Sequence, residues 1–352
     1  MVSEPSEILL RGPNWTGDLV MATPGFRAVR GRFPKARITL QVRPGLEALM
    51  HGAPWFDEVV PVTSYHRGTA AVLREARELR RRAPRFDLGI CIPDSFSAAL
   101  LMRAGGVREV AGYRRGGRGV LLHTPVTPPS AWGSHRRVAR ERFVLDLVGA
   151  LGCPERGTHL ELFTTPVEEK RAAQALSSRG VDSARPWVAL APGASYGPSK
   201  CWPAESFAAV ADAVVRAGGQ AVLVGAPAEA PLAARVRAAT CEPTADLVGA
   251  LDLGSLKAVL RRASALVCND AGARHVAVAF GVPAIVLMGP TDLAKTNENL
   301  ERVTVLQTDV GCRPCYRRVC PIDHRCMTRI APERVVAEIL RALEPPRSED
   351  GR

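Results

Sequence analysis

The chain has 352 residues, of which 46% are hydrophobic and 23% charged, so it is long enough for two domains and is not a disordered composition. No apolar run approaches the roughly 18 residues that a membrane-spanning helix needs. The longest run, residues 282–288, fits a buried strand. Residues 1–10 include Glu4 and Glu7 and lack a basic, apolar leader pattern. We therefore expect a cytoplasmic protein, with attachment to a membrane surface left open.

Positive charge is concentrated in the first half of the chain. Lys and Arg total 47 against 35 Asp and Glu, a net charge of +12. Residues 74–142 contain 15 Arg, no Lys and 6 acidic residues, a net of +9. Such a segment fits a polyanionic partner: nucleic acid, acidic lipid or phosphorylated glycolipid. The alternative is a solvated basic face in a chain that uses Arg in place of Lys.

Short apolar runs alternate with amphipathic stretches, which is typical of parallel α/β units. In the first half this pattern predicts strand 7–11, helix 19–30, strand 38–42, helix 69–82, strand 88–92 and helix 135–151. A second series comprises strand 187–191, helix 204–217, strand 221–224, a helix ending at residue 239, helix 256–262, strand 265–268, helix 273–280, strand 284–288 and helix 332–343.

Two series of similar length predict an α/β fold with two Rossmann-like domains, residues 1–170 and residues 171–343. Residues 344–352 are polar and contain proline, and we expect them to form a disordered tail. The final helix is a candidate to pack back on the first domain. Ligands of such a pair bind at the carboxyl ends of the strands.

The turn after the first predicted strand contains Gly12, Asn14 and Gly17 and is followed at once by Asp18. The glycines let the backbone approach a ligand closely. Asp18 then fits a carboxylate that takes a proton from an acceptor hydroxyl. The alternative is an acid at the cap or first turn of the next helix, where it favours the helix dipole. Spacing alone favours this second interpretation.

The loop of residues 192–203 follows a buried strand and precedes a helix. Its small residues, Ser195 among them, and its single Lys200 are able to cradle a phosphate through backbone N–H groups and one point charge. The glycine spacing is neither a P-loop nor a dinucleotide fingerprint. A flexible turn with a surface lysine is the alternative.

A third strand end, glycine turn and helix start occur at Asp270, Gly272 and His275. The N–H groups at a helix N-terminus suit a diphosphate. Asp270 is placed to hold sugar hydroxyls, and His275 lies one turn into the helix, within reach of phosphate. The alternative is that Asp270 caps the helix and His275 is a structural histidine.

Four cysteines, Cys312, Cys315, Cys320 and Cys326, lie within fifteen residues and have His324 among them. A CxxC pair is a familiar metal half-site, so zinc or iron is a candidate. The irregular spacing of the second pair argues against a zinc ribbon, and buried packing cysteines are the alternative. We expect no disulfides in a cytosolic chain.

Taken together, residues 11–24, 192–205 and 269–275 with 289–292 resemble the motifs of the ADP-heptose:lipopolysaccharide heptosyltransferases, glycosyltransferase family 9. The resemblance is strongest to the heptosyltransferase II members, in which a segment like 312–326 is also common, and it runs from about residue 8 to residue 330. It implies a GT-B fold, two Rossmann-like domains facing each other across a cleft.

The resemblance also implies an activity. The family transfers L-glycero-D-manno-heptose from ADP-heptose to the lipid A-linked inner core of lipopolysaccharide, with inversion at the anomeric carbon. Residues 1–170 would bind the acceptor and residues 171–343 the nucleotide sugar. No metal or other cofactor is implied, and no nucleic acid is expected as a partner. Asp18 matches the general base of the family, within an acceptor loop that includes Asn14 and Gly17.

The residues that the resemblance assigns to the nucleotide sugar all lie in the second half. Lys200 binds the diphosphate, Glu229 the ribose hydroxyls and Asp270 the heptose hydroxyls. The remaining members of this set are Ser195, Gly272 and His275.

One position departs from the family pattern. Relatives carry Thr or Ser between the Asp and the Gly, whereas this chain has Ala271. The loss of one charge-assisted hydrogen bond to phosphate costs about 1.5–3 kcal/mol. Three other functions are therefore kept open: the same fold with another acceptor, a non-catalytic module that binds a polyanion, and a metalloenzyme that uses the cysteines.

Overall fold

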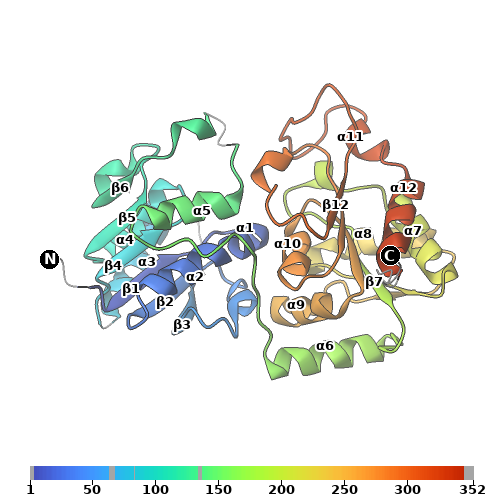
Figure 1. The fold of residues 1–352 in the computed structure, drawn as a ribbon, viewed down its shortest axis with the longest axis horizontal. Helices are drawn as coiled ribbons and strands as arrows, with labels where there is room; N and C mark the ends of the chain where they lie inside the picture. The colour runs from blue at the N-terminus through green and yellow to red at the C-terminus, as the bar shows by residue number, and fades with distance from the viewer. Residues whose placement is uncertain (1–3, 63–67, 83, 134–136, 345–352) are drawn as a thin grey trace, which may run out of the picture. The chain divides into compact units, whose positions relative to one another are not determined.

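The computed structural model describes residues 4–62, 68–82, 84–133 and 137–344. The chain forms two compact units (Figure 1). The first extends to Phe163 and includes Ala294–Glu298, and the second contains Thr164–Leu293 and the chain from Asn299 onward. The predicted boundary at residue 170 falls inside a helix of the second unit. Residues 345–352 of the predicted tail lie outside the described part.

The first unit is built on a six-stranded parallel sheet with the strand order β3-β2-β1-β4-β5-β6. Its strands are β1 (Glu7–Arg11), β2 (Arg37–Val42), β3 (Glu58–Pro61), β4 (Leu88–Cys91), β5 (Glu109–Tyr113) and β6 (Thr124–Val126). Its helices are α1 (Thr16–Met21), α2 (Thr23–Arg32), α3 (Thr69–Arg81), α4 (Phe96–Ala104) and α5 (Arg140–Gly149).

The second unit repeats this architecture with the order β12-β11-β10-β7-β8-β9, again all parallel. Its strands are β7 (Trp187–Ala191), β8 (Gln220–Leu223), β9 (Thr244–Asp246), β10 (Ala265–Asn269), β11 (Ala284–Leu287) and β12 (Val303–Leu306). Its helices are α6 (Pro166–Ser178), α7 (Ala204–Arg216), α8 (Ala230–Ala239), α9 (Leu253–Arg262), α10 (Gly272–Ala279), α11 (Arg325–Thr328) and α12 (Pro332–Leu343).

Both sheets have the strand order of a Rossmann fold, in which the chain winds outward from one central strand and then restarts beside it. The order reverses between β1 and β4 in the first unit and between β7 and β10 in the second. Ligands of such sheets bind beyond the carboxyl ends of the strands at this reversal. The loops after these four strands are therefore where each unit is expected to carry its chemistry.

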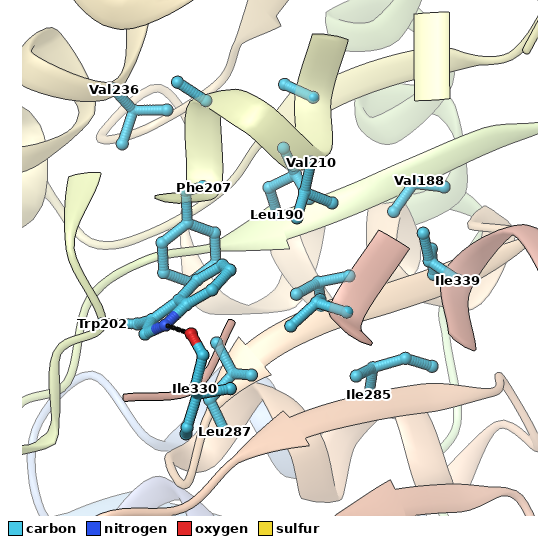
Figure 2. Close-up of a cluster of buried hydrophobic side chains, with 14 of the residues drawn as sticks. Val188, Leu190, Trp202, Phe207, Val210, Val236, Ile285, Leu287, Ile330 and Ile339 are labelled. Carbon is cyan, nitrogen blue, oxygen red and sulfur yellow. Dashed lines mark hydrogen bonds between the residues drawn. The ribbon is translucent and has the colours of Figure 1, made fainter. Parts of the chain in front are cut away.

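The core of the second unit explains why the sequences of its central strands are continuous apolar runs. All five residues of β7 are buried, as expected for a strand that is covered on both faces. Figure 2 shows the cluster on one face, where Trp202 packs edge-on against Phe207 with ring centroids 5.2 Å apart. The indole Nε1 of Trp202 donates to the Ile330 carbonyl at 3.0 Å. This bond attaches the loop after β7 to the segment that leads into α12.

The final helix, α12, belongs to the second unit. Val335 and Ile339 are four residues apart, and this spacing places them on one helix face, fully buried in the core of that unit. The helix packs against α7 there. The apolar face that made this helix predictable is thus covered within its own unit.

The first helix of the second unit, α6, was missed from the sequence. α6 begins with a capping box, in which the Thr165 side chain accepts from the Glu168 N–H and Glu168 accepts from the Thr165 N–H. Buried Glu168 also lies 3.4 Å from the fully buried Lys257 ammonium of α9. α6 is therefore fixed to the second unit, which is why the division precedes the predicted boundary.

Most other predicted elements are confirmed to within a few residues. The predicted helix 19–30 is instead two helices, α1 and α2, which meet at Ala22. The break falls there because Pro24 in the first turn of α2 has no N–H to continue the earlier helix. The predicted helix 135–151 is α5, and residues 135–136 of it are not described. Besides α6, the strands and α-helices missed from the sequence are β3, α4, β5, β6, β9, β12 and α11.

Over the described ranges, none of the helices is long and apolar enough to cross a membrane.

Candidate active site

The second unit brings together residues that are far apart in the sequence at the carboxyl ends of three strands. Lys200 lies in the loop after β7, Glu229 follows β8, and Asp270 follows β10 directly. Gly272 and His275 are in the first turns of α10, the next element. Ser195 is on the same loop as Lys200, with its side chain exposed.

A buried ion pair joins the loops after β7 and β10. The Lys200 Nζ donates to the Asp270 Oδ2 and to the Asp270 backbone carbonyl, both at 2.7 Å. Thr291 donates its hydroxyl to the same Oδ2 at 2.7 Å, and the Arg274 guanidinium lies 3.6 Å from Oδ1. Since only 9% of the Asp270 side chain is exposed, its charge is balanced almost entirely by these neighbours.

The pKa of Asp270 reflects a contest between burial and these partners. Burial raises the pKa, because it penalises the charged form. The charge and hydrogen bond of Lys200, the Thr291 hydroxyl and the charge of Arg274 outweigh burial and lower the pKa to about 2. Asp270 is therefore a carboxylate at neutral pH, which accepts hydrogen bonds and has no proton to donate.

Asn269, the last residue of β10, fixes the loop after β7 to the same place. Its Oδ1 accepts from the Trp202 N–H at 3.0 Å, and its Nδ2 donates to the Pro192 carbonyl at 2.6 Å. The side chain is fully buried. Sequence reasoning gave Asn269 no role, although an amide at the end of an otherwise apolar strand was the signal.

The N-terminus of α10 has its first backbone N–H groups beside the ion pair. Gly272 is the first residue of the helix, and Ala271 is the N-cap residue. The methyl group of Ala271 has no oxygen to accept from the first-turn N–H groups, unlike Ser or Thr at such a position. These donors and the positive end of the helix dipole favour an anion there.

His275 is held as a neutral imidazole. Burial and the positive charge of Arg274 lower its pKa, the charge of Asp270 opposes them, and the net result is a pKa of about 3. With 6% of its surface exposed, the ring is buried within range of the charges of Arg274, Asp270 and Lys200. At neutral pH it contributes a hydrogen-bonding ring and no charge.

Glu229 lies over two glycines at the ends of β7 and β8. A Cβ atom on Gly193 or on Gly225 would overlap the Glu229 carboxyl group, so glycine at both positions makes room for it. The Ala226 N–H donates to Glu229 Oε2 at 2.9 Å. Burial raises the pKa of Glu229, and this hydrogen bond opposes the rise. A partly buried carboxyl group thus borders the same edge of the sheet as Lys200.

In the first unit, Asp18 is in the first turn of α1, after the N-cap residue Trp15, so it does not cap the helix. Its Oδ1 lies 3.6 Å from the Arg140 Nε of α5, and 26% of the side chain is exposed. Asn14 accepts from the buried Arg11 guanidinium at 2.6 Å, which holds the loop that leads to α1. Gly17 precedes Asp18 in the same turn.

The four clustered cysteines are free thiols. Cys312 and Cys315 are exposed, whereas Cys326 is buried. Burial and then the charges of the other three thiols raise the pKa of Cys326, so the four lie in one neighbourhood. Within the described ranges, the structure contains no group of three or more His, Cys, Asp or Glu side chains placed to hold a metal ion.

Comparison with known proteins identifies the family. The model for glycosyltransferase family 9 (heptosyltransferase) matches residues 72–325. The chain belongs to this family. It is therefore a glycosyltransferase, as the motifs predicted, and its two Rossmann-like units confirm the predicted fold class.

Individual relatives agree with this assignment. Lipopolysaccharide heptosyltransferase 2 of Escherichia coli strain K12 is 27% identical over 349 residues, covering 95% of this chain and 97% of the relative. The solved E. coli ADP-heptose LPS heptosyltransferase II superposes with a TM-score of 0.79 at 24% identity, covering 96% of this chain and 98% of that one. A family 9 glycosyl transferase from Veillonella parvula gives a TM-score of 0.83 at 21% identity, covering 96% and 97%.

The lowered pKa of His275 predicts a specific dependence of stability on pH. The unfolded chain takes up this proton near pH 6.5 and the folded chain only near pH 3. Stability therefore falls as pH falls through this window, and the residue has no such effect above it. As the pH is lowered through this window, the free energy of unfolding should fall less steeply for His275→Gln than for the wild type. The two slopes should differ by up to about 1.4 kcal/mol per pH unit. Urea unfolding at several pH values measures both slopes, and parallel profiles for the two proteins would contradict the assignment.

Proposed function

We propose that this glycosyltransferase moves L-glycero-D-manno-heptose from ADP-heptose to the inner core of lipopolysaccharide, with inversion at the anomeric carbon. The observation that carries the proposal is the buried Lys200–Asp270 pair beside the N-terminus of α10. It combines a cation, unused helix N–H groups and a carboxylate in one place. A sugar diphosphate needs all three.

The donor chemistry follows from the geometry of Lys200. An ammonium has three N–H donors. Two of them are directed at Asp270, and the ammonium also lies 5.2 Å from the centre of the Tyr196 ring. We assign the third N–H to a phosphate oxygen. As the bond from the sugar to the diphosphate breaks, negative charge develops on the departing ADP. Lys200 and the N–H groups at Gly272 stabilise that charge, an electrostatic contribution of the kind that dominates many enzymes.

The sugar and ribose are assigned to the two carboxyl groups. Asp270 is ionised and accepts hydrogen bonds from heptose hydroxyls. Glu229 borders the same edge of the sheet, over Gly193 and Gly225, where it accepts from the ribose hydroxyls. Ser195 and His275 complete the lining of the donor site.

The acceptor is assigned to the first unit, with Asp18 as general base. In a single displacement, Asp18 takes the proton of an acceptor hydroxyl while the oxygen of that hydroxyl forms the bond to the anomeric carbon. The bond from that carbon to the diphosphate oxygen breaks, and ADP leaves with the electron pair. Asn14 and Gly17 shape the loop that presents Asp18.

The basic charge of the first unit supports an anionic acceptor at a membrane surface. Arg74, Arg77 and Arg80 are exposed on α3, a helix whose buried side packs on the unit. Lipid A-linked core is anionic and lies in a bilayer, so we assign the enzyme to the cytoplasmic face of the inner membrane as a peripheral protein. The charge serves this glycolipid and not nucleic acid.

Acceptor-dependent release of ADP tests the reaction and its base. Purified protein with ADP-heptose and lipopolysaccharide core truncated after its first heptose should release ADP. Asp18→Ala should abolish release while ADP binding stays nearly unchanged, because Asp18 lies in the unit that does not hold the nucleotide. A coupled assay measures release, and calorimetry measures ADP affinity.

The isosteric Asp18→Asn is the matched control, since it keeps the shape of the side chain and removes only the base. It should be as inactive as Asp18→Ala. Turnover retained in both variants would remove Asp18 from the mechanism. ADP binding without acceptor-dependent release in the wild type would reject this acceptor.

Replacing Ala271 with threonine should increase the affinity for ADP. Ala271→Thr should restore a hydroxyl that bonds the diphosphate and lower the Kd for ADP about 10- to 100-fold, equivalent to about 1.5–3 kcal/mol. Ala271→Val has the same shape without the hydroxyl and should give no gain. Titration calorimetry on the three proteins distinguishes these results, and an equal affinity for the Thr and Val variants would refute a role for the hydroxyl.

A further inference from the structure

Ser199, next to Lys200, has each of its polar groups bonded to one distant segment of the chain. Its N–H donates to the Arg318 carbonyl at 3.1 Å, and its hydroxyl donates to the Arg317 carbonyl. Its own carbonyl lies 2.7 Å from the His324 Nε2. The residue is buried, with 3% of its surface exposed. The N–H, the hydroxyl hydrogen and the carbonyl of this buried serine are thus all bonded to one segment, which holds the residue in place.

Two further contacts join the same two segments. The Tyr196 hydroxyl donates to the Tyr316 carbonyl. A Cβ atom on Gly197 would lie 2.5 Å from the Arg318 carbonyl oxygen, so no side chain fits between the loop after β7 and the segment beside it. The Arg318 guanidinium also lies 5.5 Å from the centre of the Tyr196 ring. The Lys200 ammonium lies 5.2 Å from the centre of the same ring.

Residues 316–324 bury little apolar surface of their own. The side chains of Val319 and Ile322 are 66% and 58% exposed. Their neighbours Arg317 and Arg318 are exposed as well. The polar contacts with the loop after β7 are therefore a principal attachment of this segment. The same contacts hold the loop against the segment.

The position of Lys200 depends on these contacts through the peptide that follows Ser199. The Ser199 carbonyl belongs to the peptide group that leads directly into Lys200. A carbonyl only accepts, so the His324 Nε2 must carry the proton in this bond. By fixing that peptide plane, His324 fixes the direction in which the Lys200 side chain leaves the backbone. Lys200 is thereby aimed at Asp270.

We propose that residues 316–324 are a clamp on the donor loop and that His324 is a positioning residue, which sets Lys200 for the diphosphate through the Ser199 carbonyl. This inference rests on the proposed donor site and goes beyond it, because none of the residues of the clamp was assigned to the donor. The cysteine-rich segment thereby acquires a role that requires no metal.

The clamp couples the donor site to a buried thiol. Cys326 is two residues beyond His324 and is 6% exposed, so a thiol reagent reaches it only when this region opens. If opening also releases Lys200, ADP must dissociate first. The labelling rate of Cys326 should then fall by up to a factor of 1 + [ADP]/Kd. Cys312 and Cys315 are exposed and should react at the same rate with and without ADP.

The first test compares His324→Ala with His324→Gln, whose side-chain amide retains a donor for the Ser199 carbonyl. His324→Ala should raise both the Kd for ADP and the KM for the donor about 5- to 10-fold. His324→Gln should recover most of that loss. Val319→Ala removes an exposed side chain from the same segment and should match the wild type. Titration calorimetry and steady-state kinetics give these values.

The second test follows thiol labelling of the wild type by mass spectrometry, and it holds even where a variant fails to fold. ADP should protect Cys326 and leave Cys312 and Cys315 unprotected. Wild-type protein that binds ADP without protecting Cys326, or whose affinity is unchanged in His324→Ala, would overturn the clamp alone. Wild-type protein that binds no ADP would overturn the proposed donor, and the clamp with it.

Discussion

The ion pair between Lys200 and Asp270 is the contact on which the proposed donor site depends. A carboxylate with 9% of its side chain exposed persists as an anion only because Lys200, Thr291 and Arg274 surround it. Removing one partner of such a pair leaves an uncompensated buried charge, at a cost of about 3–5 kcal/mol. The pair also connects the loops after β7 and β10, between which the strand order of the sheet reverses. One interaction thus holds the two loops together and places a cation and a carboxylate side by side.

The two units share a topology and differ in chemistry. Each sheet winds outward from a central strand and restarts beside it, so each has one reversal point with loops at its carboxyl edge. In the second unit this edge carries a cation, helix N–H groups and two carboxyl groups. In the first it carries Asp18, on a short helix beside Arg140. The fold supplies equivalent positions, and the loop residues determine what each unit binds.

Sequence patterns were sufficient for much of the fold and for placing those candidate residues that lie in the loops after central strands. Lys200, Asp270 and Asp18 each come after an apolar strand, and this order predicts a place at the carboxyl edge of a parallel sheet. Asn269 and His324 could not be assigned in this way. Their partners lie 67 to 77 and 125 residues away, so only the folded chain brings them together. The short edge strands, such as β9 and β12, lacked the long apolar runs that made central strands recognisable.

Binding of ADP and of adenosine to a charge-free variant tests the donor site most directly. Lys200→Met combined with Asp270→Asn removes both charges of the pair, so neither partner is left as the unpaired charge that a single substitution would create. The Kd for ADP, measured by calorimetry, should rise about 10- to 100-fold, because a charge-assisted bond to phosphate is lost. Adenosine, which has no phosphate, should bind the variant as it binds the wild type. Equal affinity of the two proteins for ADP would contradict the assignment of the diphosphate to Lys200.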